Sequence, residues 1–490
     1  MINLSLIGQD YRYELEKLIR IFFPFEKISV NDGNISKENT IICMLERKDK
    51  KTLFFVDVSI FGKSDSGESE ISNETYDYEM ECEIAIAILL YNCLVSITGY
   101  TPPWGILTGI RSAKLYSRIA QTGDADKYFK EKFCVSDKKI NLCKQTALSE
   151  EKIISLSKNN SFSLYISIPF CPTRCSYCSF VSHSVKQAKK LIPTYIEYLC
   201  REIEDTARIA KKCNLKLETI YIGGGTPTTL EADELSLIMN SINSNFDLSN
   251  LREYTVEAGR PDTITTEKLM AIKHGGATRI SINPQTMNDN ILEKIGRKHT
   301  SKQTIDAFNL ARECGFDNIN MDLIAGLPEE DFESFKETIA QILELAPESI
   351  TVHSLSLKRA STLNKNQDFF DFSDGICASS MVDFAKETLE ENEIYPYYMY
   401  RQSKTVGNLE NVGYSKKGYE CLYNVYIMDE THSILACGAS AVTKLREPGG
   451  NNIERVYNFK YPYEYIDRFD EIISRKGSVV EFYEKYPIFN

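Results

Sequence analysis

The chain has 490 residues, 42% of them hydrophobic, and its 69 acidic side chains outnumber its 57 basic ones. The resulting formal net charge of −12 has the wrong sign for a protein that its overall field holds to nucleic acid, so no nucleic-acid partner is expected. A chain of this length exceeds the usual size of a single core, which predicts two or three domains.

The sequence indicates neither export nor a transmembrane segment. Its first residues, "MINLSLIGQDYRYELEK", lack the charged, apolar and small-residue regions of a signal peptide. The most apolar stretch, residues 84–100, is interrupted by Asn92 and Ser96 and falls short of the roughly 18 residues that span a bilayer, so it predicts a buried helix. The 14 cysteines form no disulfide-like array, and reduced thiols in a cytoplasmic protein are expected.

Residues 1–155 are expected to form a small α+β domain. The segment "KTLFFVDVSIFG" (51–62) predicts a strand, and the polar segment "KSDSGESEISNE" (63–74) that follows predicts a loop. The apolar stretch at 84–100 supplies the helix of this domain.

Residues 160–375 alternate apolar strand candidates with segments of helical periodicity. Six β-then-α units in series predict a parallel sheet with right-handed crossovers, either an open sheet or a barrel, and the rhythm alone does not separate the two. The strand candidates are "SLYISI" (163–168), "LETIYI" (217–222), "EYTVEA" (253–258), "TRISIN" (278–283), "NINMDL" (318–323) and "SITVHSLS" (349–356).

Residues 376–490 are expected to form a third domain that covers the substrate. From Tyr395 the pattern changes to short segments rich in tyrosine and glycine, as in "YPYYMYRQSKTVGNLENVGYSKKGYECLYNVYIM" (395–428). This pattern predicts β hairpins and loops.

Unusual residues follow successive strands of the predicted sheet. The loops after parallel strands converge at one edge, which is where sites lie in such sheets. Each feature has an ordinary structural explanation, such as a turn or a helix cap, but their coincidence at one edge favours a functional site. In chain order they are a cysteine loop, "GGGTPT" (223–228), Glu257, Asn283 with Gln285, and Asp322.

Three cysteines, Cys171, Cys175 and Cys178, have C-x3-C-x2-C spacing within "YISIPFCPTRCSYCSF" (165–180). A structural zinc site requires four ligands, and the nearest candidate for the fourth ligand is His183. An iron–sulfur cluster also takes thiolates, and three of them on one loop can grip three irons of a [4Fe–4S] cube and leave the fourth open.

The same spacing, with the aromatic Tyr177 before the last cysteine, resembles the cluster loop of radical S-adenosylmethionine (SAM) enzymes. The resemblance implies that SAM chelates the open iron and that one electron from the cluster cleaves it to a 5′-deoxyadenosyl radical. It also implies a full or partial TIM-like barrel. The expected fold is therefore α/β, a partial TIM-like (β/α)6 radical SAM barrel with a small α+β N-terminal domain and a β-rich C-terminal extension.

The residues at the strand ends suit the parts of SAM. Backbone groups of the glycine turn, residues 223–225, can approach the methionyl group closely because glycine has no Cβ. Glu257 and Asp322 suit the cationic and hydroxyl parts of SAM. Arg297 can pair with its carboxylate through a planar fork, and Gln285 can hydrogen-bond the ribose or the amino acid portion.

Longer stretches narrow the resemblance. The segments "YIGGGTPT", "RISINPQTMNDNILEKIGRKHT" and "NMDLIAGLPEE" resemble the oxygen-independent coproporphyrinogen III dehydrogenase (oxidase) family, and "PPWGILTGIR" with "VEAGRPDT" resembles its HemZ branch. The resemblance covers essentially the whole chain. It implies that Cys171, Cys175 and Cys178 ligate the cluster and that SAM contacts come from Tyr165, Tyr177, Gly224, Gly225, Thr226, Glu257, Gln285, Arg297, Asp322 and Ser356.

The implied reaction is the oxidative decarboxylation of two propionate side chains of coproporphyrinogen III to vinyl groups. It implies a flavodoxin- or ferredoxin-type electron donor and an electron acceptor. A tetra-anionic porphyrinogen also needs cations near the site. The candidates are Arg260, Arg401, Lys404, Lys416 and Lys417.

Two positions depart from the family's pattern, and the first of them favours heme trafficking. Phe180 stands where the characterised enzymes carry a further cysteine, whereas the related heme chaperones have an aromatic residue there. The family's carboxy-terminal His-Asn pair appears as Tyr423-Asn424, without the heme-ligating histidine. The alternatives are therefore a heme-delivery protein with a cluster and SAM but no decarboxylase activity, and a zinc protein on a barrel scaffold.

Overall fold

The computed structural model describes residues 1–30, 39–178, 180, 183–357, 372–402 and 404–488. The chain divides into two compact units, residues 1–145 with 401–409 and residues 146–400 with 410–490. The expected division into three domains stays a prediction, and residues 358–371 of the expected barrel range lie outside the described residues.

The first unit contains a five-stranded sheet with the order β2-β1-β3-β4-β5. Strand β1 pairs in parallel with β2 and β3, and the other pairs are antiparallel. The strands are β1 (Ile2–Ile7), β2 (Ile28–Val30), β3 (Thr40–Arg47), β4 (Lys51–Ile60) and β5 (Lys63–Ser72), and the helices are α1 (Arg12–Phe22), α2 (Tyr78–Thr98), α3 (Ser112–Ala120), α4 (Ala125–Phe133) and the start of α5 (Asp137–Ile154).

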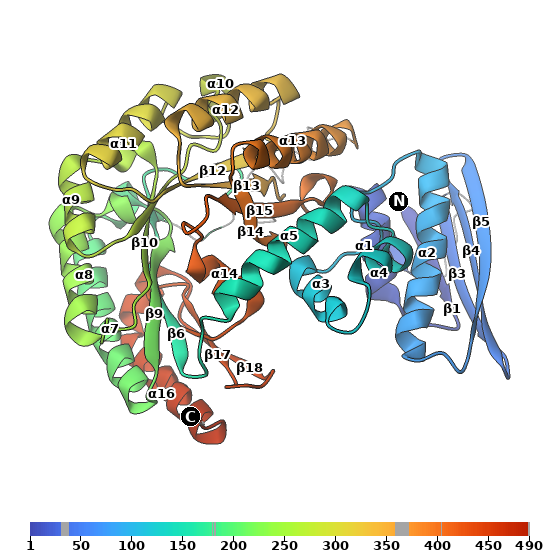
Figure 1. Ribbon diagram of the computed structural model, residues 1–490, viewed down its shortest axis with the longest axis horizontal. Coiled ribbons are helices and arrows are strands. Elements are labelled where there is room, and N and C mark those ends of the chain that lie inside the picture. Colours follow the sequence, from blue (N-terminus) through green and yellow to red (C-terminus); the bar gives the residue numbers. More distant parts are fainter. Residues whose placement is uncertain (31–38, 179, 181–182, 358–371, 403, 489–490) are drawn as a thin grey trace. The chain divides into compact units, whose positions relative to one another are not determined.

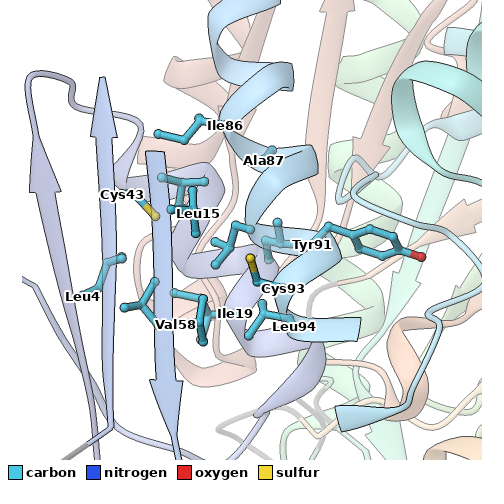
Figure 2. Packing of buried hydrophobic residues seen from close by; sticks show 14 of the residues in the cluster. Leu4, Leu15, Ile19, Cys43, Val58, Ile86, Ala87, Tyr91, Cys93 and Leu94 are labelled. Carbon is cyan, nitrogen blue, oxygen red and sulfur yellow. The ribbon is translucent and has the colours of Figure 1, made fainter. Parts of the chain in front are cut away.

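Helix α2 belongs to the core of this unit. Among the described helices it alone is long and apolar enough to cross a membrane, but half of its most apolar window is buried. Figure 2 shows Ile86 and Leu94 of α2 in one cluster with Leu15 of α1 and Val58 of β4. The prediction of a buried helix is therefore confirmed, although the helix begins six residues before the apolar stretch.

The prediction of a loop over residues 63–74 is wrong, because residues 63–72 form strand β5. This strand pairs with β4 along its whole length. Phe61 and Gly62 join the two strands with φ values of 51° and 78°, which is the backbone of a tight hairpin turn. The alternation of serine with acidic residues in β5 fits an edge strand with an exposed face.

The second unit confirms the predicted series of six β/α units. Its strands run parallel in the order β13-β12-β11-β10-β9-β6, within a sheet of eleven strands. Figure 1 shows the helices on the outer side of the curved sheet, which leaves an interior. The strands are β6 (Ser161–Ile168), β9 (Lys216–Gly224), β10 (Glu253–Gly259), β11 (Arg279–Ile282), β12 (Ile319–Ala325) and β13 (Ser349–Ser354), and the helices that follow them include α7 (Ile192–Lys212), α8 (Ala232–Asn245), α9 (Thr266–His274), α10 (Asp289–Lys294), α11 (Ser301–Glu313), α12 (Phe332–Leu345) and α13 (Phe372–Glu391).

The two faces of the parallel strands differ in polarity. Successive side chains of a strand point to opposite faces, so one set faces the helices and the other faces the interior. The first set is apolar and buried, as in Ile222, Val256 and Met321. The interior set is largely polar and lines a cavity; it includes Tyr165, Tyr221, Thr255, Glu257, Arg279, Ser281, Asn320, Asp322, Thr351 and His353.

The C-terminal part extends the sheet at both ends, which confirms the β-rich extension. Strand β15 (Glu410–Ser415) pairs antiparallel with β13, and β16 (Ser433–Cys437) pairs in parallel with β6. The other strands are β14 (Tyr395–Arg401), β17 (Val442–Arg446) and β18 (Ile453–Tyr457), and the helices are α14 (Leu422–Asp429), α15 (Pro462–Asp467) and α16 (Phe469–Lys485).

The prediction of hairpins and loops is wrong for residues 422–429, which form helix α14. Its amino-terminal end is capped from β10, because Glu253 accepts hydrogen bonds from the backbone N–H groups of Leu422 (2.8 Å) and Tyr423 (3.3 Å). This cap comes from a residue almost 170 positions away, so the local sequence does not reveal it.

We expect Glu253→Ala to lower the free energy of unfolding by about 1–3 kcal/mol, because two buried N–H groups lose their acceptor. Glu253→Gln, which retains a carbonyl oxygen, should lose less. Denaturant unfolding of both variants checks this, and wild-type stability in the alanine variant would contradict it.

Candidate active site

The cysteine loop is held at both of its ends. It leaves β6 through the short strand β7 (Phe170–Cys171), which pairs in parallel with β8 (His183–Ser184) after the loop. The pairing brings Phe170 opposite His183, so the segment that carries Cys175 and Cys178 closes on itself. The three cysteine side chains are each partly exposed, as ligands for a bound group need to be.

The glycine turn after β9 braces this loop from the neighbouring strand. Gly225 N–H donates to Ile168 O and Thr226 N–H donates to Phe170 O, each at 2.7 Å. The Thr226 hydroxyl lies 3.5 Å from Cys171 Sγ. A Cβ on Gly225 would lie 2.5 Å from Phe170 O, so only glycine permits this approach. These two N–H groups therefore support the start of the cysteine loop.

Two arginines hold the other side of the cysteine loop. Arg260 forms a bidentate pair with Asp262 at 2.9 Å and reaches Thr173 Oγ1 at 3.2 Å and Cys175 Sγ at 3.8 Å. Arg297 donates to Tyr177 Oη at 3.0 Å and to Asn283 O at 2.9 Å. The two arginines therefore fix the position of the cysteine loop on this side.

The donor set of the loop fits a [4Fe–4S] cluster. Burial, with the neighbouring Cys175 and Cys171, raises the pKa of the Cys178 thiol to about 11, so its thiolate needs a compensating cation such as iron. Among the described residues, no three His, Cys, Asp or Glu side chains are spaced as ligands of one metal ion. Cluster cysteines each bind a different iron and stand further apart. His183, the candidate fourth zinc ligand, packs edge-on against Tyr461 and Tyr463.

A cavity of about 660 Å³ occupies the barrel interior, a volume typical of small-molecule sites. Its walls combine four of the predicted SAM contacts with tyrosines and cations. The predicted contacts are Tyr165, Gly224, Glu257 and Asp322, and the other lining residues include Tyr221, Arg279, His353, Tyr398, Tyr400, Tyr423, Lys444, Arg455 and Phe180.

Glu257 combines a buried carboxyl group with two donors. Its carboxyl oxygens accept from the Tyr221 hydroxyl at 2.6 Å and from Gly224 N–H at 3.3 Å. Burial is the main reason that the pKa of Glu257 rises to about 7, and Asp322 adds to the rise. The carboxyl group therefore changes charge near neutral pH.

Asp322, unlike Glu257, has a lowered pKa and stays ionised. Burial acts to raise its pKa, but His353, Asn320 and Thr351 together keep it below the usual range. Asn320 donates to Asp322 Oδ1 at 2.7 Å, and His353 Nε2 lies 3.7 Å from Oδ2. The site thus offers a permanent carboxylate beside a titrating one.

The remaining predicted SAM contacts do not line the cavity. Gln285 has φ of 74° and its backbone exchanges hydrogen bonds with Asp322 and Ile324, which extends the β12 edge. The others hold the cysteine loop or follow β13; they are Tyr177, Gly225, Thr226, Arg297 and Ser356.

The structure gives the surroundings of several candidate substrate cations, whose role stays a prediction. Arg401 lies in the first unit, where it donates to Leu107 O at 2.6 Å and stacks over Trp104. Lys416 follows β15 beside Glu348, at the amino-terminal edge of the parallel strands and so opposite to the cysteine loop. The cavity lining includes none of the five candidates Arg260, Arg401, Lys404, Lys416 and Lys417.

The sequence analysis did not identify several residues that line the cavity, although the sequence pattern marks two of them. Arg279 and His353 stand inside the predicted strands "TRISIN" and "SITVHSLS", in register with other polar residues of the interior face. A polar residue within an apolar strand marks an interior that is not a packed core. Lys444 and Arg455 lie on the later strands β17 and β18, and only the fold brings them to the cavity.

Comparison with known proteins fixes the family. The model of the Radical SAM superfamily matches residues 165–342. The chain is 38% identical over 405 residues to the "oxygen-independent coproporphyrinogen-III oxidase-like protein HemZ" of Bacillus subtilis (strain 168), which covers 81% of this chain and 80% of that protein. The chain belongs to the radical SAM superfamily and to its HemZ-like branch. Membership in this superfamily implies a [4Fe–4S] cluster and SAM.

The chain is also similar to two further known proteins. It is 41% identical over 194 residues to the "heme chaperone HemW" of Bacillus subtilis (strain 168), covering 39% of this chain and 50% of that protein. The structure of coproporphyrinogen III oxidase (HemN) from Escherichia coli, described as a radical SAM enzyme, matches with a TM-score of 0.50 and 22% identity over 66% of this chain and 72% of that chain. The latter match shows a shared fold.

We expect Gly225→Ala to displace the start of the cysteine loop, because its Cβ would clash with Phe170 backbone atoms. Iron and sulfide per chain after anaerobic reconstitution should fall to a small fraction of wild type, and stability should fall by about 1–3 kcal/mol. Gly477→Ala is the control, since nothing lies within 4 Å of its Cβ. Full cluster content in Gly225→Ala would contradict the bracing role.

Proposed function

We propose that the protein is a radical SAM oxidoreductase that decarboxylates coproporphyrinogen III without oxygen and yields protoporphyrinogen IX. The observation that carries the proposal is the single cavity that joins predicted SAM contacts to a tyrosine-rich wall and to cations. Such a lining suits a large cyclic molecule with apolar rings and anionic arms.

When bound, the cluster and SAM supply a 5′-deoxyadenosyl radical that takes a hydrogen atom from the β-carbon of a propionate. The chain positions that carbon and keeps water and oxygen away from it. Tyr221 and Tyr423 have rings 4.5 Å apart and 24° from parallel, which offers a flat surface for a pyrrole ring. Carbon dioxide then leaves, and an acceptor takes the remaining electron.

Two cations that line the cavity, Lys444 and Arg455, suit the substrate's carboxylates. Lys444 and Arg455 both approach Glu430 Oε1, at 3.3 Å and 3.6 Å. This carboxylate holds both cations beside the cavity. A flavodoxin- or ferredoxin-type protein in the cytoplasm would supply the electron that reduces the cluster.

The second candidate function is heme delivery without decarboxylation. The observation that favours it is Phe180, which is 64% exposed and lines the cavity where the decarboxylase pattern has a cysteine. The 41% identity to a heme chaperone over 194 residues supports the same candidate. In this function the tyrosine-rich wall would bind the porphyrin face.

One anaerobic assay separates the two functions. We expect reconstituted protein, given SAM, a reductant and coproporphyrinogen III, to form vinyl-bearing products and 5′-deoxyadenosine, and Cys175→Ser to form neither. Product masses and a heme titration are measured on the same sample. Cleavage of SAM without vinyl product would contradict the decarboxylase, and stoichiometric heme uptake in that sample would favour delivery.

Glu257 predicts a pH dependence of SAM binding. An ionised Glu257 attracts the positively charged sulfonium group of SAM, and protonation below its pKa of about 7 removes that attraction. The dissociation constant of SAM should therefore rise about tenfold from pH 8 to pH 6. Glu257→Gln should bind SAM weakly at both pH values, with little change between them.

Equilibrium dialysis of reconstituted protein checks this, with Glu337→Gln on the exposed face of α12 as the control. An unchanged pH dependence in Glu257→Gln would assign the titration to another group.

A further inference from the structure

A buried arginine in the cavity wall forms no ion pair within 4 Å among the described residues. Arg279 is 2% exposed and lines the cavity from the first position of β11. Its Nη2 donates to Ser349 Oγ at 2.8 Å, but its Nε and Nη1 have no hydrogen-bond acceptor. The ion pairs of the described residues do not include Arg279. An arginine keeps its charge in proteins, so this is a permanent buried cation.

A second orphaned polar atom lies beside it. Thr255 is the backbone partner of Arg279 on β10, also lines the cavity, and its buried hydroxyl has no hydrogen-bond partner. Native proteins rarely leave buried polar groups unsatisfied, and a buried charge without a partner is costlier still. Two such groups on adjacent strands, facing one cavity, indicate that a ligand completes them.

The position of this pair fits a ligand that reaches inward from the SAM end. Glu257 pairs with Ser281, so Arg279 and Thr255 lie one inward-facing step deeper than Glu257. Tyr165 and Tyr221 stand at the same level through the registers of β6, β9 and β10. A molecule that passes these rings would bring an anionic end to Arg279.

We propose that Arg279, with Thr255, anchors a carboxylate of the tetrapyrrole substrate in the cavity, one inward-facing step deeper than Glu257. The inference rests on the proposed tetrapyrrole substrate. The guanidinium presents its planar fork to the carboxylate, and the Thr255 hydroxyl donates to the same group. The anchor distinguishes a free acid from its ester, because an ester cannot accept the charge-assisted bonds as a carboxylate does.

The test compares coproporphyrin III, an air-stable and fluorescent tetra-acid, with its tetramethyl ester by titration of the full chain. Arg279→Met should weaken binding of the acid about tenfold to a hundredfold, with little effect on the ester. Arg279→Lys should lose less, and Thr255→Val should weaken the acid by a few-fold. Arg312→Met is the control, since its partner Glu348 lies outside the cavity lining.

The affinity for SAM, measured on reconstituted protein, separates the two sources of a carboxylate. Unchanged SAM affinity in Arg279→Met supports the anchor, whereas loss of SAM affinity with retained coproporphyrin binding assigns Arg279 to SAM instead. Equal weakening of acid and ester would overturn the anchor. Wild-type protein that binds neither porphyrin would overturn the tetrapyrrole substrate itself. Thermal unfolding shows whether Arg279→Met folds, and Thr255→Val and Arg279→Lys carry the test if it does not.

Discussion

The site depends on one close backbone approach, in which the turn after β9 reaches the start of the cysteine loop after β6. Gly225 and Thr226 donate to Ile168 O and Phe170 O at 2.7 Å, and no side chain fits at position 225. Because β6 and β9 are neighbours in the sheet, this contact sets the loop at the carboxyl edge of the barrel. The cavity begins at the same place, with Gly224 in its wall.

The polar interior follows from the same architecture. Helices cover only one face of the parallel strands, and apolar residues pack against them there. On the other face, polar side chains need hydrogen-bond partners, which come from the interior itself or from a ligand. Asp322 is satisfied internally through His353 and Asn320, and Glu257 only in part through Tyr221. Arg279 and Thr255 are left incomplete. Some polar side chains of the interior thus find all their hydrogen-bond partners within the protein, whereas others need a ligand to complete theirs.

The sequence predicted features whose signal is local. Six apolar strands, the cysteine spacing and the carboxylates Glu257 and Asp322 all follow from short patterns, and the structure contains the strands as expected. Helix α14 was missed because its cap, Glu253, comes from a distant strand. Charge alone made Lys416 a candidate substrate cation, whereas the register of β15 with β13 places it at the amino-terminal edge of the parallel strands.

The central proposal is that Cys171, Cys175 and Cys178 would hold a [4Fe–4S] cluster and leave one iron for SAM. Its most direct test is the electron paramagnetic resonance spectrum of the reduced cluster, recorded without and with SAM. The account predicts that SAM shifts the g-values, because its amino and carboxylate groups join the open iron. A spectrum that SAM leaves unchanged, in protein with a full complement of iron, would contradict the account.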